Sequence, residues 1–529
     1  MNTNAMNRPS DIYPMTKRFL ITVLGLLLAN GPLLAEVKLA SPFTSHMVLQ
    51  RDSKVPVWGT ADAGEKITVE FAGQKVSATA GTDGKWSVQL KALEASSEPR
   101  TLVVTGDLKS KVTNVKCEDV LVGEVWLASG QSNMNFTMSK SVKRYAGVTN
   151  EEQEIAAANY PLIRMFLCDE QKAYSPATHN NGEWKVCTPE NAPAFTAVGY
   201  FFARDLHKEI QVPIGIIKAA FGASTAEAWI RREAMAADPK LKPMLDQFDA
   251  DVEKFRAIPA PAAAAAETRS EDVSAPKSKS KKPKPPQDPV QDQHNATVMF
   301  NGMIAPVIPY AIRGAIWYQG ESIKSDLGGV ALYPRVQAAL IRDWRKLWEL
   351  GDFPFYIVQL AGLDASRLSE TREAQATVLS LPNTGMAVAM DIGEAKNVHP
   401  RNKQDVGNRL ARIALANTYG KKMEYSGPVF ESMKVEGATV RVRFSHADGL
   451  TAKDGDLKWF AVAGADGKSV PATAKIHGST VVVSSPDVTA PVAVRYAWVN
   501  FPDGGHLYNA AGLPAAPFRT DAPKFDLND

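Results

Sequence analysis

The chain has 529 residues, of which 45% are hydrophobic and 22% charged, and its net charge at neutral pH is +3. This length predicts two or three domains, and so small a net charge gives no reason to expect nucleic acid or an anionic membrane surface as a partner. The three cysteines, Cys117, Cys168 and Cys187, lack metal-ligand spacing, and their odd number favours free buried thiols, with a Cys168–Cys187 pair as the alternative.

The N-terminus is typical of an export signal. Lys17 and Arg18 precede an apolar run at residues 19–29, and a small residue, Ala35, ends a stretch that fits a cleavage site. The run is short for a membrane span, so an uncleaved anchor is the less favoured alternative. We therefore expect a signal peptide at residues 1–35, cleaved near Ala35. The mature protein is expected in the periplasm or outside the cell, without a membrane span.

Short alternating strands dominate the two flanks of the mature chain. Residues 36–118 are predicted to form an N-terminal β-sandwich domain, because strand patterns separated by turn residues occur at 55–59, 66–71 and 86–90. Residues 429–529 are predicted to form a second β domain, or a β cap on the core, with strands at 439–444, 480–483 and 494–499.

Strands and helices alternate in the region between, residues 119–428. Strands are expected at 120–128, 214–219, 312–318, 355–360 and 386–390, and helices at 201–210, 333–350 and 406–417. This alternation predicts an α/β fold with a parallel sheet covered by helices on both faces. An Ala-, Pro-, Ser- and Lys-rich stretch at 257–293 is predicted to be a disordered insertion, with polyanion binding by its basic tract as the alternative.

Ser132 follows directly on one of the predicted strands. The strand ends at Gly130, and Gln131, Ser132 and Asn133 come next, where a helix can begin. Such a position lies at the carboxyl edge of a parallel sheet, where open α/β folds bind their ligands. Ser132 is therefore a candidate nucleophile whose N–H could stabilise an oxyanion, and Asn133 is a candidate substrate-binding residue. A simple helix N-cap is the alternative role for Ser132.

His399 is the histidine, among eight, that best fits a base for Ser132. It lies between a predicted strand and a predicted helix, in the segment 391–400, and so at the same edge of the sheet. Histidine is the usual general base near neutral pH. An incidental loop histidine is the alternative interpretation.

Two further strand ends carry polar groups. Gly222 follows the strand that ends near residue 219, and Gln319 and Glu321 follow the strand at 312–318. The Gly222 N–H and the Gln319 amide are candidate oxyanion donors, with turn formation and N-capping as the alternative. Glu321 or Asp391 could orient the imidazole of His399 as the acid of a triad does.

Several blocks of the chain, taken in order, resemble the sialate O-acetylesterases. These belong to the wider SGNH hydrolases and are similar to the carbohydrate esterases that remove acetyl groups from xylan. An ordered set of blocks is more specific than any single motif, and the resemblance covers most of residues 37–522 outside the insertion. The blocks lie at 130–134, 301–306, 317–322, 391–400, 407–411 and 512–519.

The resemblance implies a flavodoxin-like three-layer α/β/α core with flanking β-sandwich-type domains. It also implies Ser132 as nucleophile and His399 as base, with oxyanion donors at Ser132, Gly222 and Gln319. No metal or organic cofactor is expected.

The acid of the triad is less clear from the resemblance. Many SGNH members carry an aspartate three residues before the histidine, where this chain has Lys396. Glu321 is then the first choice, because similar carbohydrate esterases use the glutamate of a Gln-Gly-Glu block. Asp391 is the second choice, and a Ser–His dyad is the third possibility.

We therefore expect a secreted serine esterase that removes O-acetyl groups from sugars through an acetyl-enzyme, with a sialate O-acetylesterase as the first interpretation. An acetylxylan or other polysaccharide deacetylase is the alternative among enzymes. A carbohydrate-binding protein with an inactive esterase-like core is the alternative from another class. In each case the expected partner is an O-acetylated sugar or glycan and not a nucleic acid.

Overall fold

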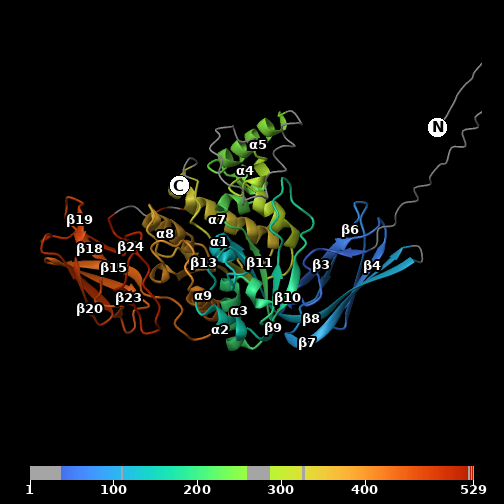
Figure 1. Ribbon diagram of the computed structural model, residues 1–529, viewed down its shortest axis with the longest axis horizontal. Helices are drawn as coiled ribbons and strands as arrows, with labels where there is room; N and C mark the ends of the chain where they lie inside the picture. The colour runs from blue at the N-terminus through green and yellow to red at the C-terminus, as the bar shows by residue number, and fades with distance from the viewer. Residues whose placement is uncertain are drawn as a thin grey trace, which may run out of the picture. The chain divides into compact units, whose positions relative to one another are not determined.

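A largely parallel sheet forms the centre of the protein (Figure 1). The computed structural model describes residues 37–108, 111–258, 286–324, 328–521, 525 and 527. The strand order is β10-β9-β11-β8-β12-β13-β14, with only β10 antiparallel to its neighbour. The strands are β8 (Lys111–Gly130), β9 (Tyr160–Leu167), β10 (Glu183–Cys187), β11 (Ile214–Ala220), β12 (Gly314–Tyr318), β13 (Phe355–Gln359) and β14 (Thr384–Val388).

Helices cover both faces of this sheet because its buried strands are apolar on both sides. Val125 of β8 shares a hydrophobic core with Trp344 of α7 (Gly329–Trp348). Trp126, which points to the opposite face, shares another core with Phe202 of α3 (Ala197–Ile210) and Leu410 of α9 (Lys403–Asn417). The predicted α/β class with a three-layer core is confirmed.

The other helices lie in the connections between strands. The α-helices are α1 (Ser132–Asn135), α2 (Glu151–Ala156), α4 (Arg232–Ala237), α5 (Lys242–Arg256) and α8 (Leu368–Ala376). The 3-10 helices are η1 (Ala192–Ala194), η2 (Ala226–Trp229), η3 (Pro289–Gln291), η5 (Ala305–Val307), η7 (Thr377–Ser380) and η8 (Met390–Ile392), and η4 (Phe300–Ile304) is a π-helix.

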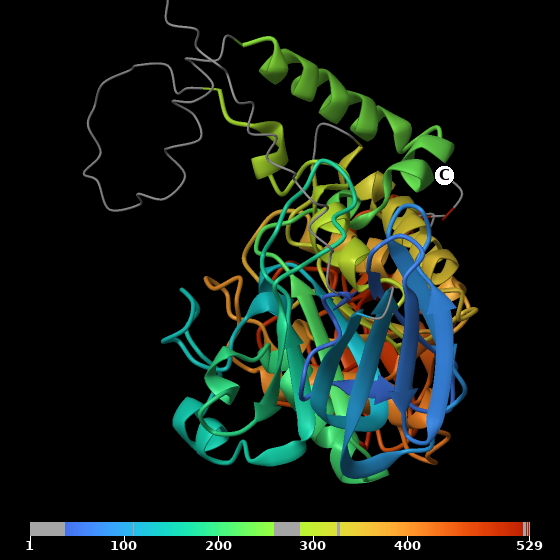
Figure 2. The same cartoon turned by 90° about the vertical axis from the view of Figure 1, so that its right-hand side faces the viewer.

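The N-terminal strands continue directly into the central sheet, as the blue ribbon in Figure 2 shows. The first half of β8 pairs with β7, and its second half lies between β11 and β12. The predicted boundary between residues 118 and 119 therefore falls inside one strand, and the division into domains stays a prediction. The other strands here are β1 (Lys38–Leu39), β2 (Val48–Gln50), β3 (Val55–Thr60), β4 (Lys66–Phe71), β5 (Gln74–Thr79), β6 (Lys85–Leu90) and β7 (Ser96–Leu108).

The C-terminal strands form small antiparallel sheets beside β14. Val388, the last residue of β14, and Met390, the first residue of η8, share a core with Val442 and Tyr496 of these sheets. The strands are β15 (Val429–Glu436), β16 (Thr439–Ser445), β17 (Thr451–Lys453), β18 (Phe460–Ala463), β19 (Ser469–Pro471), β20 (Thr473–His477), β21 (Thr480–Ser484), β22 (Ala493–Tyr496), β23 (His506–Tyr508) and β24 (Phe518–Arg519).

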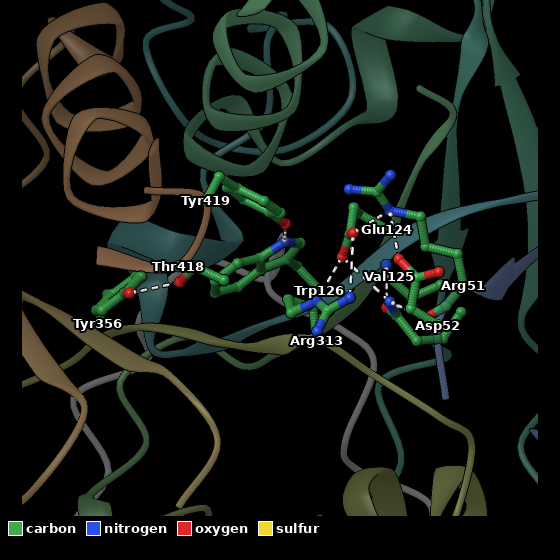
Figure 3. A network of polar contacts seen from close by, with 10 residues as sticks. Arg51, Asp52, Glu124, Val125, Trp126, Arg313, Tyr356, Thr418 and Tyr419 are labelled. Carbon is green, nitrogen blue, oxygen red and sulfur yellow. Dashed lines mark hydrogen bonds and ion pairs between the residues drawn. The ribbon is translucent and has the colours of Figure 1, made fainter. Parts of the chain in front are cut away.

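A buried ion-pair network ties the N-terminal strands to the amino edge of the central sheet (Figure 3). The Glu124 carboxylate of β8 accepts hydrogen bonds from Arg51 Nε at 2.5 Å and from Arg313 Nε at 2.7 Å. Burial opposes ionisation of Glu124, but Arg313 and Arg51 hold its pKa below the ordinary value. Removing one partner of such a pair is costly because the other charge stays buried. The network therefore fixes β8 at Glu124, on the amino edge of the central sheet, whereas Ser132 lies at the carboxyl edge.

Three sequence-based predictions concern other parts of the chain. The predicted signal peptide, residues 1–35, lies outside the described residues, as does most of the predicted insertion, of which the ends at 257–258 and 286–293 are described. Cys117, Cys168 and Cys187 are free and buried, as predicted. Within the described ranges, no helix has the length and apolar character needed to cross a membrane.

Candidate active site

The sharp exit of the chain from β8 sets the position of Ser132. Gly130 has φ = 135°, and a Cβ added there would lie 2.2 Å from the Tyr318 carbonyl oxygen, so only glycine fits. The next N–H, of Gln131, donates to that same carbonyl at 2.9 Å. Ser132 then opens α1 at the carboxyl edge of the sheet and is 7% exposed. The strand end predicted to present this serine does so.

His399 meets Ser132 directly. The distance from His399 Nε2 to Ser132 Oγ is 2.7 Å, which lets the imidazole accept the hydroxyl proton. The ring of Tyr145 packs edge-on against the imidazole, with 5.1 Å between the ring centres. Burial and, to a smaller degree, the charge of Lys403 lower the pKa of His399 to about 4. The imidazole is therefore neutral, and able to act as a base, at neutral and mildly acidic pH.

Asparagine side chains fix the loop that carries His399. Asn397 Oδ1 accepts a hydrogen bond from the His399 N–H at 3.0 Å, and Asn397 Nδ2 donates to the His399 carbonyl at 3.0 Å. From α1, Asn133 Nδ2 donates to the Val398 carbonyl at 2.9 Å. Asn133, which follows the nucleophile, therefore binds Val398, which precedes the base. This contact fixes the two reacting groups relative to each other.

Gly222 lies across from the nucleophile and, like Ser132, has a backbone N–H without an acceptor among the described residues. A Cβ added to Gly222 would lie 3.9 Å from Ser132 Cβ and 3.6 Å from the Tyr145 hydroxyl, so this glycine faces the serine. Across the described part of the chain, no acceptor binds the N–H of Ser132 or of Gly222. Both donors are thus available to an oxyanion formed at Ser132.

Gln319 and Asn133, also expected at the oxyanion or substrate, have other partners. Gln319 is 0% exposed, and its amide nitrogen donates to the carbonyls of Ser224 at 3.3 Å and Ser322 at 2.8 Å. Asn133 Nδ2 donates to Glu321 as well as to Val398. In this arrangement both amides hold the walls of the site, because their N–H groups already have acceptors.

The two candidate acids differ in position. Glu321 Oε1 accepts from Asn133 Nδ2 at 2.5 Å, and burial raises the pKa of Glu321. Asp391 lies in η8, where Arg409 binds both of its oxygens at 2.7 Å and Tyr508 donates to one at 2.5 Å. Among the described residues, no hydrogen bond joins either carboxylate to the imidazole of His399. Glu321 reaches the histidine loop through Asn133, whereas Asp391 is held by a separate ion pair.

Two residues of the site were missed from the sequence. Tyr145 forms one wall, since its ring contacts His399 and its hydroxyl faces Gly222. Lys403 is completely buried in the first turn of α9, and its Nζ donates to Asn133 Oδ1 at 2.6 Å. A cation is unfavourable in the first turn of a helix, so Lys403 carried a signal that could have been noticed. Tyr145 lies in a loop and carried none.

A group of lysines surrounds Glu170 beside α1. Glu170 Oε1 accepts hydrogen bonds from Asn135 Nδ2 at 2.8 Å and from Lys143 Nζ, and Lys218 Nζ lies 3.5 Å away. Lys143 also donates to Asn135 Oδ1 at 3.1 Å. Asn135 is the last residue of α1, three positions after Ser132. Lys143 and, through Glu170, Lys218 are therefore linked to the end of the short helix that Ser132 opens.

A third lysine approaches from the Gly222 side. Lys172 Nζ lies 4.8 Å from the ring centre of Phe221, the residue before Gly222. We call Lys143, Lys172 and Lys218 the lysine cluster. Burial and the charge of Lys143 lower the pKa of Lys218 to about 8. The charges of Lys218 and Lys143 act on Glu170, and those of Asp292 and Glu170 act on Lys172, so ammonium and carboxylate groups alternate beside the site.

The arrangement has the parts needed for acyl transfer. A serine hydroxyl lies within hydrogen-bond distance of a neutral histidine, and the N–H groups of Ser132 and of the neighbouring Gly222 have no acceptor in the described part of the chain. In the ranges that the structure describes, no group of three or more His, Cys, Asp or Glu side chains could hold a metal ion.

The protein is similar in sequence and in structure to known carbohydrate esterases. The family model of carbohydrate esterases described as sialic acid-specific acetylesterases matches residues 293–416. The sialate O-acetylesterases of Rattus norvegicus and Homo sapiens are each 27% identical over 91% of this chain and 94% and 92% of their own lengths. A carbohydrate acetylesterase from Xanthomonas citri has a TM-score of 0.76 and 35% identity, covering 92% of this chain and 100% of that one.

Proposed function

We propose that this chain removes O-acetyl groups from sugars, with Ser132 as nucleophile and His399 as general base. The chain belongs to the family of sialic acid-specific carbohydrate acetylesterases and is a carboxylic ester hydrolase. The observation that carries the proposal is the 2.7 Å distance between Ser132 Oγ and His399 Nε2 at the carboxyl edge of the sheet. The N–H groups of Ser132 and Gly222, to which no described residue offers an acceptor, support it.

The reaction proceeds in two steps. His399 takes the Ser132 proton as the hydroxyl oxygen attacks the acetyl carbon, and the N–H groups of Ser132 and Gly222 stabilise the negative oxygen. The protonated His399 then gives its proton to the departing sugar oxygen, which leaves an acetyl-enzyme on Ser132. Water, losing a proton to His399, attacks this ester, and His399 passes that proton to Ser132 Oγ as the bond to the acetyl group breaks and acetate leaves. The site works as a Ser–His dyad, with Glu321 acting on the histidine loop through Asn133.

An acidic sugar is the substrate that the surroundings of the site favour. The lysine cluster places three ammonium groups near α1 and Phe221, and charge-assisted hydrogen bonds to a carboxylate are among the stronger polar contacts. Sialic acid carries such a carboxylate and a neutral acetylated xylan does not. We therefore propose an O-acetylated sialic acid as substrate, with a neutral polysaccharide as the alternative.

Acetate release tests both parts of this proposal. The kcat/KM of the purified protein for acetate release is expected to be higher with O-acetylated sialic acid than with acetylated xylo-oligosaccharides. Ser132→Ala is expected to release almost no acetate from either substrate. A serine-directed covalent probe should label the wild type at Ser132. A higher kcat/KM with acetylated xylo-oligosaccharides would contradict the proposed substrate but not the proposed mechanism. A Ser132→Ala enzyme with near-normal turnover would refute the mechanism itself.

Export of the protein is part of the same proposal. The basic and apolar pattern of residues 1–35 supports cleavage near Ala35 and a periplasmic or extracellular location. Fractionation of producing cells, with N-terminal sequencing of the protein found outside the inner membrane, tests it. A protein that stays in the cytoplasm with its first 35 residues intact would refute it.

A further inference from the structure

Lys403 is a buried cation at the base of the active site. Its side chain is 0% exposed, and it stands at the first position of α9, where the helix dipole disfavours a positive charge. Burial lowers the pKa of Lys403 to about 7, and Glu321 and Glu394 offset part of that effect. A lysine in such a place costs stability unless its surroundings compensate the charge.

The contacts of Lys403 lead to both reacting groups. Its Nζ donates to Asn133 Oδ1 at 2.6 Å, and it lies 4.6 Å from the ring centre of Phe136 and 5.6 Å from that of Tyr318. Asn133 follows the nucleophile, and its Nδ2 donates to the Val398 carbonyl at 2.9 Å. A chain of two hydrogen bonds therefore runs from the ammonium group, through Asn133, to the residue before His399.

We propose that Lys403 is a positioning residue that holds His399 against Ser132 through Asn133 and whose buried positive charge adds to the effect of burial in disfavouring protonation of the imidazole. This inference rests on the proposed roles of Ser132 and His399. Lys403 touches neither reacting atom, so its effect passes through the hydrogen-bond chain and through the electric field.

The groups around the imidazole leave Lys403 as the charge that acts on it. Tyr145 packs against the ring, and burial together with Glu170 raises the pKa of Tyr145 to about 12, so it is neutral. The Ser132 hydroxyl is also neutral. Burial and the charge of Lys403 are the two causes of the low pKa of His399.

The charges that face Lys403 itself come from two segments. Glu321, after β12, and Glu394, in the loop before His399, both favour the ammonium form. Because burial raises the pKa of Glu321, that carboxyl gains a proton as the pH falls and then no longer balances Lys403. At a pH near the pKa of His399, the pH is well below the pKa of Lys403, so Lys403 is fully charged. Its positive charge therefore acts on the imidazole in the pH range where His399 takes up a proton.

Two substitutions separate the charge from the hydrogen bond. Lys403→Met removes both, whereas Lys403→Gln removes the charge and keeps an N–H group that can donate to Asn133. For both variants we expect the acid limb of the kcat/KM–pH profile to move upward by about 0.5–1 pH unit. We expect kcat at neutral pH to fall by about 10- to 100-fold in Lys403→Met and by less in Lys403→Gln.

Lys396→Met is the matched control, since it removes an exposed lysine from the same loop, three residues before His399. Its acid limb should coincide with that of the wild type, because solvent screens an exposed charge. Thermal melts establish that each variant is folded, and Lys403→Gln serves alone if Lys403→Met does not fold.

An acid limb that stays in place in every folded Lys403 variant, with an inactive Ser132→Ala enzyme, would overturn this inference while leaving the proposed function intact. An active Ser132→Ala enzyme would instead remove the basis of both.

Discussion

The Oγ of Ser132 and the Nε2 of His399 lie 2.7 Å apart although 267 residues separate them in the chain. Ser132 follows β8 in the middle of the sheet, and His399 follows β14 at its edge. The loop after β14 spans this distance because Asn133 Nδ2 binds the Val398 carbonyl. The pair is thus a consequence of tertiary structure that no local sequence pattern specifies.

Loss of either member of this pair should abolish most of the activity. Ser132→Ala and His399→Ala are each expected to reduce kcat for acetate release by about 10³-fold or more, because each removes the nucleophile or its base. The double variant should be no slower than the slower single variant, since the two groups act as one unit. Purified variants with unchanged thermal melts are required. Additive losses in the double variant would contradict a shared step.

Activity should persist into mild acid. The base works only when neutral, and the pKa of His399 is lowered to about 4, first by burial and then by Lys403. We therefore expect kcat/KM to be flat from neutral pH down to about pH 5 and to fall below that, because kcat/KM reports the free enzyme. An acid limb near the ordinary histidine value of about 6.5 would contradict this assignment.

The same shift predicts the sign of one contribution to stability. Between about pH 6.5 and pH 4 the unfolded chain protonates His399 and the folded chain does not. Protons then favour the unfolded state, so the free energy of unfolding should decrease as the pH falls through this window. Urea titrations of the wild type and His399→Ala should differ in this slope.

The strand ends were predictable because a local rule specifies them. Gly130 and Ser132 stand where an apolar run stops, and the structure ends β8 at that glycine, whose φ no other residue adopts easily. The length of β8 was not predictable. Its first half is defined by pairing with β7, so a domain boundary drawn from the change of pattern at residue 118 falls within a strand.

The surroundings of the site were harder to predict from the sequence. Gln319 follows its strand as expected, but the acceptors of its amide, Ser224 and Ser322, are known only once the loops are folded. Asp391 lies near His399 in sequence, yet Arg409 and Tyr508 bind it, and Tyr508 belongs to a distant C-terminal strand. Residue type and spacing therefore identify candidates, whereas partners depend on contacts far apart in the chain.

The two candidate acids should respond to substitution in opposite ways. Asp391→Ala leaves Arg409 buried without its partner, so we expect a loss of about 3–5 kcal/mol in unfolding free energy with near-normal kcat in the folded fraction. Glu321→Gln should retain most stability and lower kcat by about 10-fold or more, because it weakens the support of Asn133. Denaturant melts and acetate release distinguish them. A stable Asp391→Ala enzyme with little activity would reverse the assignment.

The two glycines at the site should also differ. Gly130→Ala forces a Cβ within 2.2 Å of the Tyr318 carbonyl oxygen at φ = 135°, and we expect about 2 kcal/mol or more of destabilisation. Gly222→Ala meets its nearest neighbours at 3.6 and 3.9 Å, so it should fold normally. Its methyl group would face Ser132 and should lower kcat/KM. Normal kcat/KM in Gly222→Ala would contradict the position assigned to the substrate.

The lysine cluster makes a prediction about the sugar. Lys143 is partly exposed and donates to Asn135 and Glu170, so a carboxylate bound beside α1 can reach it from solvent. A charge-assisted hydrogen bond contributes about 1.5–3 kcal/mol, which corresponds to roughly 10- to 150-fold in kcat/KM. We expect Lys143→Met to lose about this much with O-acetylated sialic acid and little with 4-nitrophenyl acetate.

The neighbouring Lys140 supplies the control for this prediction, because its side chain is exposed in the same loop. Lys140→Met should keep the wild-type kcat/KM for both substrates, since a solvated charge contributes little to a bound ligand. The ratio of the two kcat/KM values, anionic over neutral, is the decisive quantity because it cancels any general loss of active enzyme. If Lys143→Met lowers the kcat/KM for both substrates equally, Lys143 supports the loop and does not select the sugar. A fall in the ratio would instead place the sugar carboxylate beside α1.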